Sequence, residues 1–80
     1  MIVLIKLLEK NDEYFLYSYG YDEDNLDGKI KIYFDKERNY ELVKESSDPH
    51  IGKKGTLIAI CKLIKARDNG KLSEILCYQS

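Results

Sequence analysis

Aromatic and lysine side chains gather in two segments that are rich in strand-forming residues. Residues 13–21 hold a phenylalanine and several tyrosines, and residues 29–35 alternate lysine with apolar residues. An aromatic ring can stack on an unpaired base while a nearby lysine contacts the phosphate. The same mixture is typical of protein interfaces, and tyrosine is also a good strand former with no further role. These residues therefore indicate recognition of a nucleic acid or of a protein, and the alternative is that the rings have only a structural use.

We predict that eight of these side chains share the sheet face that points away from the helix. The register follows from a two-residue turn at Asn11-Asp12, which pairs Lys10 with Glu13. Leu7 then lies beside Leu16, and Leu16, Ser18 and Gly20 face the helix. A slip of one residue would exchange the two faces. The predicted interaction surface comprises Lys6, Phe15, Tyr17, Tyr19, Tyr21, Lys29, Lys31 and Tyr33.

A second candidate for recognition is the segment from His50 to Ile58, in which two lysines separate two glycines. This segment resembles the Gly-x-x-Gly loop of KH domains, which clamps a nucleic-acid backbone. The resemblance implies anion or phosphate contacts at Gly52, Lys53, Lys54 and Gly55. It covers about nine of the 80 residues, and the strands that we predict before it differ from the KH topology.

Catalytic residues are not indicated by any spacing in the chain. His50 is the one histidine, and no serine or cysteine lies in a recognisable nucleophile turn. Cys61 and Cys77 have apolar neighbours, so we predict two buried thiols. We therefore predict a protein that is not an enzyme and has no cofactor.

The acidic loop from Asp22 to Gly28 is the best candidate for a metal ligand set. Glu23, Asn25 and Asp27 match the first, third and fifth positions of an EF-hand loop. Phe34, however, stands where a bidentate glutamate is required. We predict a solvated acidic turn and no metal site, with weak calcium binding as the alternative.

Length and composition predict a single domain over residues 1–80. Apolar residues make up 44% of the chain, and 13 basic residues nearly balance 14 acidic ones. Bulk charge therefore does not indicate a nucleic-acid or membrane partner. The apolar stretch 1–8 contains Lys6 and lacks a cleavage site, and no stretch reaches the ~20 apolar residues that span a bilayer. We expect a cytoplasmic protein.

The elements that position these residues are one helix and up to five strands. The apolar run 55–67 predicts the helix, with Leu57, Ile60, Cys61 and Ile64 on its buried face. Its start stays open between Pro49 and Gly55, whereas Asn69-Gly70 predicts its end. The strands are expected at residues 2–10, 13–21, 29–35, 40–45 and 71–79, with a helical alternative for the last two.

The predicted fold is α+β: an antiparallel four- to five-stranded meander sheet with one helix packed on one face, in the order β-β-β-β-α-β. We expect the strand order 4-3-2-1-5 in the sheet. The function that best fits is a protein-interaction module that binds another protein or forms a homodimer through the aromatic face. The alternative is single-stranded RNA binding through Lys53, Lys54 and that face.

Overall fold

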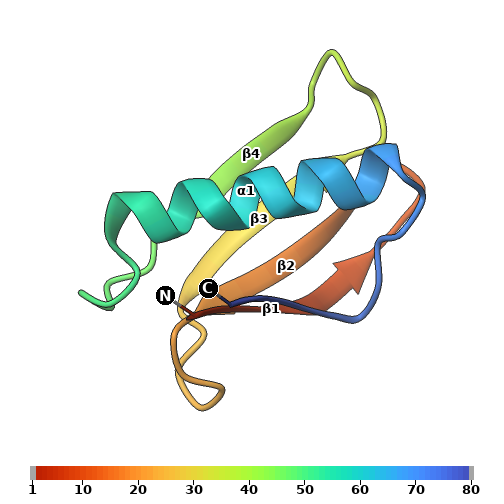
Figure 1. Cartoon of the computed structure of the whole chain (residues 1–80). Helices are drawn as coiled ribbons and strands as arrows, with labels where there is room; N and C mark the ends of the chain where they lie inside the picture. Colours follow the sequence, from red (N-terminus) through yellow and green to blue (C-terminus); the bar gives the residue numbers. More distant parts are fainter. Residues whose placement is uncertain (1, 80) are drawn as a thin grey trace.

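One helix crosses one face of an antiparallel sheet in the computed structural model, which describes residues 2–79 (Figure 1). Strands β1 to β4 precede helix α1, and strand β5 follows it. Their bounds are Ile2–Lys10 (β1), Tyr14–Gly20 (β2), Gly28–Tyr33 (β3), Tyr40–Lys44 (β4), Gly52–Asp68 (α1) and Ile75–Gln79 (β5). The sheet order is β4-β3-β2-β1-β5, as predicted. The fold is therefore α+β, and none of the described helical residues forms a segment long and apolar enough to cross a membrane.

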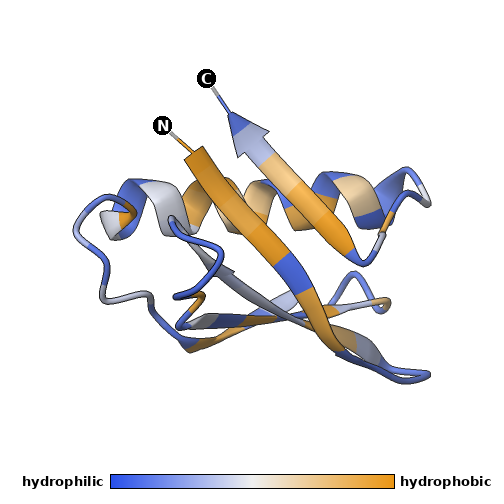
Figure 2. Ribbon diagram, turned by 90° about the horizontal axis from the view of Figure 1, so that it is seen from below, coloured by the Kyte–Doolittle hydropathy of each residue, from blue (hydrophilic) through white to orange (hydrophobic). Residues whose placement is uncertain are grey.

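Strand β1 lies inside the sheet because it pairs with β2 on one side and with β5 on the other. Its residues are apolar on both faces, as an interior strand requires. Figure 2 shows β1 and β5 as adjacent, mostly hydrophobic strands, and Ile2 at the start of β1 pairs with Gln79 at the end of β5. The alternation of residues 2–10 and 29–35 predicts Val3, Ile5, Ile30, Ile32 and Phe34 on the inward face. The first four are buried in the core beneath α1, which confirms this part of the prediction, whereas Phe34 follows the end of β3 and is 43% exposed.

Strand β2 presents the face opposite to the predicted one. Leu7 pairs with Tyr17 and Ile5 pairs with Tyr19, and both tyrosine side chains are 0% exposed. The predicted pairing of Leu7 with Leu16 is wrong by one residue. Tyr17 and Tyr19 therefore belong to the core, and Ser18 and Gly20 lie on the face away from the helix.

The turn between β1 and β2 explains the error. The side-chain oxygen of Asn11 accepts hydrogen bonds from the amides of Glu13 (2.8 Å) and Tyr14 (3.0 Å), which makes the turn longer than two residues. Lys10 consequently pairs with Phe15 instead of Glu13. The register beside the turn is thus displaced by two residues from the predicted one, and a bulge between Leu7 and Glu9 reduces this displacement to one residue. The net shift of one residue inverts every side chain of β2.

Helix α1 begins at Gly52, within the range left open by the sequence. Gly52 has a φ of +57°, a left-handed conformation that glycine adopts at little cost. At the other end, Gly70 has a φ of +66°, and the amide of Lys71 donates to the carbonyl of Ala66 at 2.7 Å. This left-handed cap confirms the predicted end of the helix.

The buried face of α1 is rotated from the predicted one. Its buried residues are Gly55, Thr56, Ala59, Ile60 and Leu63. Leu57 is 59% exposed, and Cys61 and Cys77 are both exposed free cysteines. The predictions of a buried Leu57 and of two buried thiols are therefore wrong. Residues 57–64 are apolar on almost every side of the helix, so periodicity alone could not select the side that docks.

Candidate functional site

The predicted interaction surface does not exist as one face, because its aromatic residues from β2 are turned toward α1. Tyr17 and Tyr19 are buried, and Phe15 packs against the core beside Tyr17. Tyr21 lies just beyond the strand and stacks on His50, with ring centroids 4.3 Å apart. Phe15, Tyr17 and Tyr19 therefore pack in or against the core, whereas Tyr21 remains 39% exposed, and the four rings do not form one exposed platform.

The remaining four residues of that surface, Lys6, Lys29, Lys31 and Tyr33, lie on the sheet face away from α1, as predicted. Their register places Lys6 opposite Ser18 and Tyr33 opposite Tyr14. The rings on this face are covered by cations: Lys31 Nζ lies 4.7 Å from the centroid of Tyr14, and the Arg38 guanidinium lies 4.2 Å from that of Tyr33. Such pairs stabilise the strands and leave little open ring surface for a ligand.

The buried tyrosine hydroxyls are satisfied by hydrogen bonds that join distant parts of the chain. Tyr17 donates to the carbonyl of Ser73 at 2.8 Å, and burial raises the pKa of Tyr17 to about 12. Tyr19 shares a hydrogen bond of 2.7 Å with the hydroxyl of Thr56 and accepts one from the amide of Ser46 at 3.1 Å. These bonds fix α1 and the segment that precedes it over the sheet.

The polar loops beside the start of α1 form a closed set of hydrogen bonds. Asp27 accepts from the hydroxyls of Ser46 and Ser47 and from the Ser47 amide, and these bonds lower the pKa of Asp27 to about 2. Asp48 accepts from the amide of His50 at 2.8 Å and bonds to its ring at 2.9 Å. These hydrogen bonds lower the pKa of Asp48. Because both serine hydroxyls donate to Asp27, the arrangement fixes the loop and resembles no nucleophile and base pair.

The Gly52 to Gly55 segment is the first turn of α1 and not a loop, which differs from the resemblance to a KH domain. A Cβ atom at Gly55 would lie 2.7 Å from Cγ2 of Ile51, so this glycine permits close packing. Lys53 and Lys54 are exposed at the start of the helix. Nothing in this geometry brings Lys53 toward the aromatic residues of the predicted surface, but Lys54 contributes to a different site.

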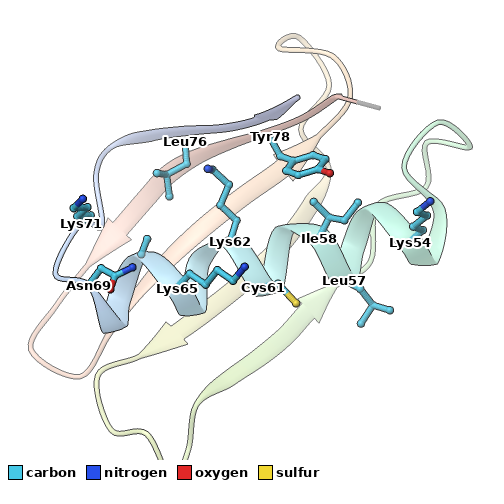
Figure 3. Close-up of a pocket in the computed structure, with 11 residues that line it drawn as sticks. Lys54, Leu57, Ile58, Cys61, Lys62, Lys65, Asn69, Lys71, Leu76 and Tyr78 are labelled. Atoms are coloured by element: carbon cyan, nitrogen blue, oxygen red, sulfur yellow. The ribbon is translucent and has the colours of Figure 1, made fainter. Parts of the chain in front are cut away.

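An apolar groove runs between α1 and β5, on the helix side of the sheet. It has a volume of about 640 Å³, which lies within the range of ligand pockets. Figure 3 shows Ile58 and Lys62 of α1 pointing toward Leu76 and Tyr78 of β5 across this space. The groove exists because no element of the described fold covers the side of α1 that carries Leu57, Ile58 and Cys61.

Four lysines surround the groove: Lys54, Lys62 and Lys65 from α1 and Lys71 from the loop before β5. Lys54, Ile58 and Lys62 are four residues apart, which places them in one row along the helix. Lys62 is half-buried, so its carbon chain adds to the apolar wall while its amine remains available at the surface. Among the described residues that line the groove, none is acidic.

No protein-family model, curated protein or solved structure matches this chain. A function for the groove must therefore follow from its shape and charge. The described residues contain no group of three or more histidine, cysteine or acidic side chains that could hold a metal ion.

The sequence carried a signal for this groove that its interpretation missed. Lys54 was predicted to contact an anion, Lys62 and Lys65 fell within the predicted helix 55–67, and Lys71 fell within the predicted strand 71–79, so no common site was predicted for these four lysines. The alternation of Leu76 and Tyr78 with Ile75 and Cys77 in β5 gives the strand an inward face that the helix only partly covers. The lysines and the inward face of β5 form one groove only because of where α1 crosses the sheet, and no local sequence pattern specifies that position.

Proposed function

We propose that this protein is an interaction module that binds an acidic segment of a partner protein in the groove between α1 and β5. The observation that carries the proposal is an apolar groove surrounded by four lysines with no acidic residue in its lining. Apolar side chains of the partner would replace water against Ile58 and Leu76, and its carboxylates would pair with the lysines. Complementary charge of this kind selects the partner and increases the rate of association.

The distribution of the lysines favours a chain with several carboxylates over a small ligand with one. Lys54 and Lys65 are eleven residues apart on α1, which corresponds to about 16 Å along the helix axis. A single carboxylate head group would need cations gathered at one end of the groove. Charges spread along its length suit a peptide whose acidic side chains are spaced in the same way.

The exposed thiols of Cys61 and Cys77 support a cytoplasmic location for this module. Free cysteines persist in a reducing compartment, whereas accessible thiols tend to form disulfides in an oxidising one. Cys61 lies in the lining of the groove, so a reduced state would keep the binding surface unmodified.

A binding titration with a synthetic peptide tests the proposal. The probe is a capped, fluorescently labelled peptide with the order Glu-Thr-Leu-Thr-Glu, measured by anisotropy. We expect saturable binding that weakens about tenfold in the double variant Lys54→Glu plus Lys65→Glu, because each reversal replaces an attraction with a repulsion. Both lysines are exposed, so the variant should retain the fold, which circular dichroism verifies.

The matched control is Lys29→Glu plus Lys44→Glu, which makes the same change of net charge on the opposite face of the sheet. We expect this control to bind the probe nearly as well as the unmodified protein. Equal weakening in both variants, or no binding of the probe at all, would contradict the proposal. Retention of a labelled single-stranded RNA that is lost in Lys53→Glu plus Lys54→Glu, with no peptide binding, would establish the RNA alternative instead.

A further inference from the structure

The two edges of the sheet differ in their protection against pairing with another chain. At one edge, β4 carries Glu41 and Lys44, and its register with β3 is broken beside Lys29. Charged residues and bulges of this kind keep an edge strand from pairing. At the other edge, β5 contains no charged residue and no proline, and its five pairs with β1 are in unbroken register.

From this contrast we propose that the partner segment binds as an extended strand that adds to the free edge of β5. The inference rests on the proposed function and specifies how the partner is held. The main chain of the segment would hydrogen-bond to β5, and every second side chain would enter the groove beside Leu76 and Tyr78. The apolar groove then supplies specificity, and the strand edge supplies affinity that does not depend on sequence.

The dimensions of the groove agree with this mode of binding. The first and fifth Cα atoms of an extended five-residue segment are about 13 Å apart, and the long side chains of lysine and glutamate can bridge the difference from the ~16 Å between Lys54 and Lys65 along α1. A central apolar residue of the added strand can therefore contact Ile58 while residues two positions away on each side reach the lysines (Figure 3). The partner motif is acidic, apolar and acidic at alternate positions.

A second copy of this chain fits the same edge poorly. Antiparallel pairing of two β5 strands about a two-fold axis normal to the sheet would leave both helices on the same face. The lysines of the two grooves would then face one another across the junction, and like charges brought together in an interface are unfavourable. An acidic partner removes this repulsion, so we assign the edge to another protein.

Two modified peptides test strand addition separately from binding itself. The first is a series of the Glu-Thr-Leu-Thr-Glu probe with one main-chain amide methylated at a time. In an added strand, every second amide points at β5, so methylation at those positions should weaken binding at least tenfold and at the others by less than about twofold. The second is the isomer Thr-Glu-Leu-Glu-Thr, which has the same composition but turns both carboxylates away from the groove, and we expect it to bind about tenfold more weakly.

The outcomes separate the two proposals. If the unmodified probe binds and the lysine variant fails, but methylation shows no alternation, the groove binds acidic peptides in another conformation and strand addition is wrong. If the isomer binds as well as the probe, strand addition is likewise overturned. If the unmodified probe does not bind, the proposed function itself fails. A protein that sediments as a stable dimer, and that excess probe converts into a probe-bound monomer, would show that a second copy occupies the edge, which overturns its assignment to another protein.

Discussion

At the scale of single residues, tyrosine explains both the stability of this core and the error in reading its sequence. A tyrosine is amphipathic, so it fits either an exposed recognition surface or a core in which its hydroxyl has a partner. Tyr17 and Tyr19 find such partners in Ser73 and Thr56. The sequence shows the ring but does not show the acceptor, which lies 56 residues away for Tyr17.

The buried hydroxyl of Tyr17 makes stability depend on pH in the alkaline range. Burial disfavours the phenolate and raises the pKa of Tyr17 from 10.0 to about 12. The folded state therefore holds this proton more tightly than the unfolded chain does. The resulting stabilisation is complete below pH 10 and is lost as the pH rises toward 12.

We expect the variant Tyr17→Phe to remove this dependence. Between about pH 10 and 12, the unmodified protein should lose about 1 kcal/mol of unfolding free energy per pH unit more than the variant. Urea denaturation of both proteins across that range measures the difference. Tyr40→Phe, at a ring that is 40% exposed, is the matched control and should follow the unmodified protein. Parallel curves for the protein and Tyr17→Phe would contradict a buried phenol.

At the scale of elements, the sequence predicted every strand and the helix but not every orientation. Strand β3 was placed correctly because lysines alternate with Ile30 and Ile32, whereas β1 is apolar on both faces and alternation alone does not select the face with Val3 and Ile5. Strand β2 was inverted because its faces, one with tyrosines and one with Leu16 and Ser18, are similar in hydrophobicity. Its register depended on the Asn11 turn and on a bulge, and neither a side-chain capped turn nor a bulge follows from alternation.

The docking of α1 depended in the same way on contacts between distant residues. Arg67 is almost buried and donates to the carbonyls of Tyr33 (2.9 Å) and Asn39 (3.1 Å), which ties the end of the helix to the turn between β3 and β4. Thr56 ties the other end to Tyr19. These two ties determine which side of the apolar run is buried and which side lines the groove. Periodicity therefore did not predict the candidate site, although the sequence shows its lysines.

Gly28 tests the placement of β2 directly. It lies opposite Tyr19, and a Cβ atom there would collide with the Tyr19 ring. We expect Gly28→Ala to cost about 1–3 kcal/mol of unfolding free energy, as overpacking of a core does. In a Tyr19→Leu background the ring is gone, so the cost should fall, and a double-mutant cycle from urea denaturation measures that coupling.

Gly20→Ala is the control for this cycle. A Cβ atom at Gly20 would lie 2.7 Å from the carbonyl oxygen of Asn25, which is backbone and does not move with Tyr19. Its cost should be the same in both backgrounds. A Gly28→Ala variant as stable as the unmodified protein, or a cost unchanged by Tyr19→Leu, would show that the Tyr19 ring does not lie across Gly28.

At the scale of the whole molecule, the surfaces of the protein differ in charge and in how far their apolar residues are covered. The face of the sheet away from α1 carries rings already covered by Lys31 and Arg38. The β4 edge is charged and bulged, whereas the β5 edge is apolar and adjoins the lysine-bordered groove. The net charge of −1 does not indicate this asymmetry, because it sums over the whole chain while four of the lysines border the groove.

The central claim is that an acidic partner segment occupies the groove between α1 and the free edge of β5. The most direct measurement is an amide chemical-shift map of the isotope-labelled protein titrated with the Glu-Thr-Leu-Thr-Glu peptide. We predict that the shifted amides are those of β5 and of α1 from Lys54 to Lys65. Shifts confined to β4 or to Lys29 and Lys31, or an unchanged spectrum at peptide excess, would contradict the claim.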